Sequence, residues 1–108
     1  MKYKIEHHFV EWEALKQTCE VFIQQFQDIN DLLRNGYTAS LELYVIREIH
    51  KKVSKKIASM QLKMQVEGSI KFDVIEIHTI HKALAPWRDE SYFYNVYHSI
   101  EQKSLLLE

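Results

Sequence analysis

Histidine is the residue of this chain that most readily suggests a metal site, and there are six histidines. His78 and His81 are three positions apart, which on a helix places their imidazoles close together. Glu76 stands in the wrong place for the Glu-x-x-His pattern of di-iron bundles, and neither His-Glu-x-x-His nor Cys-x-x-Cys occurs. We therefore expect no metal and no other cofactor. An enzyme or a metal-dependent helical bundle that uses His78 and His81 is the third functional hypothesis, after the two given at the end of this section.

Cys19 is the only cysteine, so it is the obvious candidate for a nucleophile and rules out an internal disulfide. It lies in the middle of an apolar stripe, where a cysteine is usually a small buried hydrophobe. No glycine-rich phosphate loop and no serine elbow motif is present. We expect a protein that is not an enzyme, and no small-molecule substrate is evident.

Basic side chains form the strongest electrostatic feature. The net charge is −1, but residues 36–66 hold six basic and two acidic side chains between two acidic flanks. On a helix the basic residues fall on the side away from the apolar stripe, where they could neutralise phosphates. A solvated helix face and a surface for an acidic protein are the competing interpretations. The basic face comprises Arg47, Lys51, Lys52, Lys55, Lys56 and Lys63.

Aromatic residues gather near the only proline, Pro86. Tryptophan and tyrosine are common at interface hot spots, because they give a large, rigid contact area with a polar end. They also close the open end of small helical bundles. The aromatic residues in question are Trp87, Tyr92, Tyr94 and Tyr97.

Two long helices are expected to position these candidates. An apolar stripe with steps of three and four residues predicts a helix from about Phe9 to Arg34, ended by Asn35-Gly36. A second stripe predicts a helix from Thr38 or Ser40 to about Val66. A short loop between them implies antiparallel packing. The stripes are Trp12, Leu15, Cys19, Phe22, Phe26, Ile29 and Leu33, then Ile46, Ile49, Val53, Ile57, Met60 and Met64.

Residues 61–78 fit two structures. Ile70, Val74, Ile77, His81 and Leu84 form a helical stripe, whereas alternation around Glu67-Gly68-Ser69 fits a β-hairpin. Tyr3 and Ile5 alternate with polar residues too, as a further strand would. We favour the helix. In the helical interpretation four large apolar residues face away from the two stripes, so they must contact another surface. These residues are Leu62, Val66, Phe72 and Ile75.

The expected fold is a single domain over residues 1–108. We predict an all-α, antiparallel up-and-down bundle of three to four helices, two long and two shorter ones broken at Pro86. The last helix is expected from Asp89 or Ser91 to about Leu106, with Phe93, Val96, Tyr97 and Ile100 inward. The alternative is an α+β fold with a β-hairpin at about 61–78.

The expected function is that of a small non-enzymatic protein–protein interaction module, with a homodimer as one form. The alternative is a nucleic-acid-associated regulatory protein that uses the basic face. No signal peptide or membrane span is visible, so we expect a cytoplasmic protein without a membrane partner. The partner-binding candidates are Leu62, Val66, Phe72, Ile75, Trp87, Tyr92 and Tyr94.

Overall fold

The computed structural model describes residues 2–26 and 29–107, with side chains described over 2–26 and 39–106. Over these residues the fold is α+β: four α-helices accompany a two-stranded antiparallel sheet. The all-α prediction was therefore wrong, and the alternative class fits. The elements are β1 (Lys2–His8), α1 (Phe9–Gln24), α2 (Ile29–Leu62), β2 (Glu67–Asp73), α3 (Val74–Ala83), a 3₁₀ turn (Ala85–Trp87) and α4 (Ser91–Leu107).

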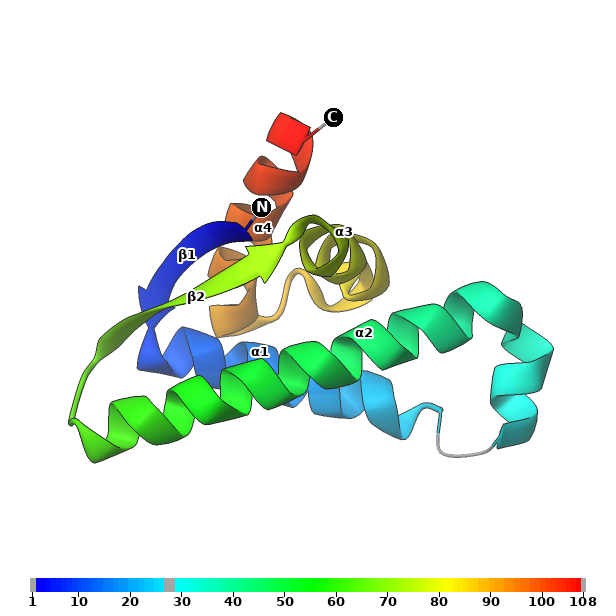
Figure 1. The fold of residues 1–108 in the computed structure, drawn as a ribbon, viewed down its shortest axis with the longest axis horizontal. Helices are drawn as coiled ribbons and strands as arrows, with labels where there is room; N and C mark the ends of the chain where they lie inside the picture. The colour runs from blue at the N-terminus through cyan, green and yellow to red at the C-terminus, as the bar shows by residue number, and fades with distance from the viewer. Residues whose placement is uncertain (1, 27–28, 108) are drawn as a thin grey trace.

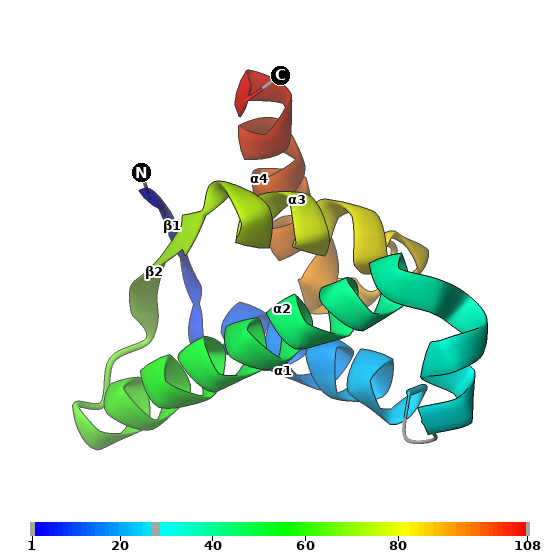
Figure 2. The same ribbon diagram turned by 45° about the vertical axis from the view of Figure 1, so that its right-hand side comes forward.

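Helices α1 and α2 lie side by side and run in opposite directions, while α3 and α4 pack across them (Figures 1 and 2). The core lies between these helices and the inner face of the sheet. Both predicted stripes face this core over much of their length, and the inward face predicted for α4 is confirmed. The buried side chains include Trp12, Leu15, Cys19 and Phe22 of α1, Ile46, Ile49, Val53, Ile57 and Met60 of α2, and Phe93, Val96, Tyr97 and Ile100 of α4.

The break between the two long helices is not where Asn35-Gly36 predicts it. Helix α1 ends at Gln24, and α2 begins at Ile29 and continues through Gly36. A glycine inside a helix costs only about 1 kcal/mol, so it does not have to end one. The ring of Phe26 packs against that of Phe22 at a tilted angle, with ring centroids 5.1 Å apart, so packing accompanies the end of α1. The side chains of Ile29 and Leu33 lie outside the described residues.

The sheet pairs two segments from distant parts of the chain. Tyr3 lies opposite Phe72, and Ile5 lies opposite Ile70. These four residues turn toward the core, and residues with more polar side chains occupy the positions between them, as expected for a half-buried sheet. The alternation of apolar and polar residues over 67–73 thus correctly indicated a strand. The strand's partner is β1, however, and not the segment before Gly68 that the hairpin alternative used.

A tight connection joins α2 to β2. Met64 follows the end of the helix with φ 54°, a left-handed conformation that usually favours glycine. Gln65 N–H then donates to the Met60 carbonyl at 2.9 Å, which closes the helix end. Gly68 lies against α2 so closely that an added Cβ would be 2.8 Å from Met60 Sδ and 2.9 Å from Lys56 Cε. The glycine therefore permits β2 to lie directly beside the last turns of α2.

Candidate functional site

The basic face lies along the outer side of α2 and just beyond its end. Arg47, Lys51 and Lys55 are exposed on the helix, and Lys63 is exposed immediately after it. Lys51 pairs with Glu48 at 3.3 Å. The predicted basic residues thus share one side of the helix, although some of their side chains are exposed and others are held by contacts with neighbouring elements.

Lys52 and Lys56 are held against the neighbouring elements. Lys52 Nζ lies 2.7 Å from Glu76 Oε1, donates to the Lys71 carbonyl at 3.0 Å and lies 5.4 Å from the centre of the Phe72 ring. Lys56 runs across Gly68. These contacts fix two cationic side chains at the boundary between α2 and β2.

A hollow of about 330 Å³ lies at this boundary. Lys71 of β2 contributes a further lysine, which the sequence analysis did not include because that segment was interpreted as a helix. Among the described residues, no carboxylate lines this hollow. Its residues are Lys52, Lys55, Lys56, Ser59, Ser69, Ile70 and Lys71.

The predicted partner-binding residues divide into surface and core. Leu62, Val66 and Ile75 are exposed, at 88, 72 and 64 %. Phe72 is fully buried, with its ring centroid 6.1 Å from that of Trp12. Its expected outward position depended on a helix over residues 70–84. Because β2 is a strand, Phe72 points inward together with Ile70.

The aromatic residues after Pro86 do not form one cluster. Trp87 is half-buried with its ring centroid 6.4 Å from that of Phe22, and Tyr97 is buried and donates to the His81 carbonyl at 3.0 Å. Tyr92 and Tyr94 are exposed, and Tyr94 stacks on His98. Trp87 and Tyr97 therefore close the core, while the other two tyrosines remain on the surface.

An apolar groove of about 450 Å³ opens between the first half of α2 and the start of α3. Leu41 and Tyr44 are exposed along α2, and Ile75 faces the groove from α3. Leu41 and Tyr44 lie beside the buried residues Val45 and Ile46 near the start of the apolar face of α2. They border this face and are 49 and 65 % exposed, respectively.

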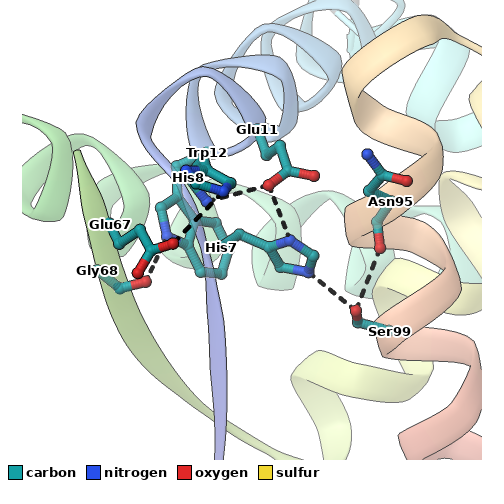
Figure 3. A network of polar contacts seen from close by, with 8 residues as sticks. All are labelled: His7, His8, Glu11, Trp12, Glu67, Gly68, Asn95 and Ser99. Carbon is teal, nitrogen blue, oxygen red and sulfur yellow. Dashed lines mark hydrogen bonds and ion pairs between the residues drawn. The ribbon is translucent and has the colours of Figure 1, made fainter.

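His7 is the centre of a polar network that joins β1, α1 and α4 (Figure 3). Its Nδ1 lies 3.2 Å from Glu11 Oε1, and its Nε2 lies 2.9 Å from Ser99 Oγ. The backbone N–H of His8 also donates to Glu11, at 3.0 Å. Trp12 Nε1–H donates to the Gly68 carbonyl at 2.9 Å and so links α1 to β2 beside this network.

The order hydroxyl, imidazole and carboxylate is the one that activates a serine nucleophile. Acyl transfer also needs donors for the developing oxyanion, usually free backbone N–H groups. Ser99 lies in the interior of α4, where the N–H groups bond within the helix. Its Oγ–H also has the Asn95 carbonyl as an acceptor, at 3.2 Å. We interpret the network as a clamp between elements and not as a catalytic triad.

Electrostatics within the clamp favour an ionised Glu11. Burial alone would raise the pKa of this carboxyl group, because it disfavours the charged form. Hydrogen bonds from the His8 backbone and from the His7 and Asn95 side chains, together with the charge of His7, outweigh burial and hold the pKa below its ordinary value. The clamp is therefore strongest when Glu11 is charged.

The other candidates for chemistry lie apart from these surfaces. His78 Nδ1 and His81 Nδ1 lie 3.3 and 3.4 Å from the buried Ser104 Oγ. Over the described residues, no group of three or more His, Cys, Asp or Glu side chains could hold a metal ion. Cys19 is buried, as expected, and burial raises the pKa of its thiol to about 12.

The chain matches no protein-family model, and comparisons with curated proteins and with solved structures found no similar one. None of the described helices combines the length and the apolar character needed to cross a membrane. The choice among the candidate surfaces therefore rests on their geometry and chemistry.

Proposed function

We propose that this chain is a small protein-interaction module that pairs with a second copy of itself along the exposed side of α2. Exposed positions of this helix recur at alternating steps of three and four residues, the spacing of a coiled-coil seam. We call this set the outer stripe, and it consists of Leu41, Tyr44, Glu48, Lys51, Lys55, Ala58 and Leu62.

The order of residue types along the outer stripe carries the proposal. Both ends are apolar and the centre is charged. When two copies pack antiparallel about a twofold axis near Lys51, Leu62 of the second copy lies opposite Leu41, and Lys55 of the second copy lies opposite Glu48. Each of these contacts then occurs twice, as an isologous interface requires. The two Lys51 side chains meet near the axis, where each keeps its own Glu48 at 3.3 Å. On either side of the axis the stripe is complementary to itself in charge and in apolar character.

The apolar groove supports the same pairing. Leu62 projects from the end of α2 with 88 % of its side chain exposed. In the proposed dimer the Leu62 side chain of the second copy enters the groove lined by Leu41, Tyr44 and Ile75. Burial of these side chains removes their exposed apolar surface from water, which drives association.

The expected dimer is weak, because only the two ends of the seam are apolar. Association costs at least about 4 kcal/mol in lost translational and rotational freedom before any contact contributes. Charged pairs on an exposed surface add about 1 kcal/mol or less each. We expect a Kd on the order of 10 µM. Nothing in this pairing requires a catalytic step or a cofactor.

Sedimentation equilibrium of the wild type and of Leu62→Glu tests the proposal. The wild type is expected to approach twice the chain mass as its concentration rises above the Kd, whereas Leu62→Glu stays a monomer because it places a charge in the groove. Leu106→Glu is the matched control, since this leucine of α4 is also exposed and lies off the stripe. A wild type that remains monomeric, or equal weakening by both variants, contradicts the proposal.

A further inference from the structure

The hollow between α2 and β2 is an unusual concentration of uncompensated positive charge. Four of its lining residues are lysines, and Ser59 and Ser69 add two hydroxyl groups. Among the described residues, the side chains of Lys55, Lys56 and Lys71 have no ion pair and no hydrogen bond, whereas Lys52 pairs with Glu76. Three lysines thus line the hollow without a counter-charge from the described part of the chain.

The sheet register adds to this repulsion. Lys71 of β2 lies directly opposite Lys4 of β1. Like charges opposite one another across an antiparallel pair destabilise it. Lys4 Nζ lies 4.0 Å from Glu6 Oε1, and both side chains are largely exposed. A bound anion is one means of relieving such a cluster.

Packing holds part of the hollow in place before any ligand arrives. The stem of Lys56 lies against Gly68, where an added Cβ would be 2.9 Å from Cε. Lys52 also donates to the Lys71 carbonyl at 3.0 Å, which holds β2 next to α2. Two walls of the hollow are therefore fixed relative to each other, and a preorganised site loses less side-chain entropy on binding.

We propose that this hollow binds the phosphate groups of a small polyanion, such as a diphosphate or triphosphate group. Ammonium and hydroxyl groups donate hydrogen bonds, and phosphate oxygens accept them. A di- or triphosphate carries several negative charges over a short length, which matches four lysines that line a hollow of about 330 Å³. The lining has no aromatic side chain on which a base could stack, so recognition is confined to the phosphates.

Calorimetric titration with inorganic tripolyphosphate at low salt tests the site. The wild type is expected to bind one tripolyphosphate per chain, with an affinity that falls as salt is added, because counter-ions compete. The double variant Lys56→Gln/Lys71→Gln should bind at least about tenfold more weakly, since it removes two charge-assisted contacts. Lys16→Gln/Lys103→Gln is the matched control, with the same change of charge outside the hollow. Lys55 is left unchanged because it also belongs to the outer stripe.

Thermal melting with and without tripolyphosphate gives a second readout. A purely structural role of Lys71 would not change the stabilisation by the ligand. Lys71→Gln should raise Tm slightly, because it removes the repulsion with Lys4, and it should reduce the stabilisation by tripolyphosphate. Absence of saturable tripolyphosphate binding, or equal weakening in the control double variant, overturns the proposal.

Duplex DNA and a single-stranded RNA of the same length distinguish a nucleic acid from a small anion. The proposal predicts that neither binds much more tightly than tripolyphosphate and that Arg47→Gln/Lys63→Gln has little effect. If a nucleic acid binds about a hundredfold more tightly and depends on Arg47 and Lys63, the whole basic face is the site and the small-anion proposal is wrong.

Discussion

His7 Nε2 lies 2.9 Å from Ser99 Oγ, although the two residues are 92 positions apart in the sequence. Because the carboxylate of Glu11 can only accept, a neutral His7 must present Nδ1–H to it. Nε2 is within hydrogen-bond distance of the Ser99 hydroxyl, whose single hydrogen also has the Asn95 carbonyl as an acceptor at 3.2 Å. This one imidazole joins the N-terminal strand to α1 and to α4.

Removal of the Ser99 hydroxyl should weaken this connection. We expect Ser99→Ala to lower the free energy of unfolding by about 1 kcal/mol, the usual net value of one hydrogen bond. Urea denaturation measures the change. Gln102→Ala on the same helix is the control and should remain within about 0.5 kcal/mol of the wild type, as is usual for an exposed position. Equal unfolding midpoints for Ser99→Ala and the wild type would show that the clamp does not stabilise the fold.

The lowered pKa of Glu11 predicts a specific pH dependence. A carboxyl group whose pKa is lower in the folded state stabilises the fold above its unfolded pKa of about 4.3, and this contribution disappears as the pH falls through the folded value. Glu11→Gln should therefore be less stable than the wild type by about 1 kcal/mol at neutral pH.

The stability difference between Glu11→Gln and the wild type should shrink in acid. Urea denaturation of both proteins at neutral pH and below about pH 4 measures it. Glu13→Gln is a control on the same helix. A difference that is independent of pH would contradict the assigned electrostatic role of Glu11.

The left-handed conformation of Met64 predicts a stabilising substitution. Its φ of 54° is costly for a residue with a Cβ, by about 1 kcal/mol or more, and its side chain is 90 % exposed, so little packing is lost on removal. Met64→Gly should raise the free energy of unfolding by about 0.5 kcal/mol, since the greater flexibility of the unfolded glycine offsets part of the gain. Met64→Ala, which keeps the Cβ, should give no such gain. Destabilisation by Met64→Gly would contradict this backbone conformation.

Cys19 should be protected from thiol reagents in the folded protein. A thiol with a pKa of about 12 is almost wholly protonated near neutral pH, and Cys19 is also buried. Because the thiolate is the reactive form, labelling should be at least about a hundredfold slower than in denaturant. Mass spectrometry of the labelled chain measures both rates. Rapid, stoichiometric labelling under native conditions would place Cys19 on the surface.

Periodicity predicted the helices better than their ends. The stripe from Trp12 to Phe22 and the inward face from Phe93 to Ile100 were predictable, because a buried helical face repeats every three or four residues. The true break after Gln24 was not, since no glycine or proline marks Gln25 or Phe26 and packing accompanies the helix end there.

The sheet and the candidate site depend on contacts between distant parts of the chain. Strand β2 was ambiguous because its short apolar run fits both the 3.6-residue repeat of a helix and the two-residue repeat of a strand. Its partner β1 lies about sixty residues earlier in the sequence, so the local pattern could not reveal the pairing. The basic face was visible along one helix. Lys71 could join it only once β2 was known to lie beside α2. The outer stripe has the three- and four-residue spacing of a coiled-coil seam. Its central positions are charged, so the apolar pattern alone does not indicate it.

Reversed charges on the outer stripe test the central claim, antiparallel self-pairing through α2, most directly. Glu48→Lys and Lys55→Glu each place like charges opposite one another in the proposed dimer, so each variant alone should be monomeric by sedimentation at concentrations where the wild type dimerises. An equimolar mixture should regain the dimer mass, because both cross-pairs then become opposite in charge. A mixture that stays monomeric while the wild type dimerises, or variants that dimerise as well as the wild type, would contradict this pairing.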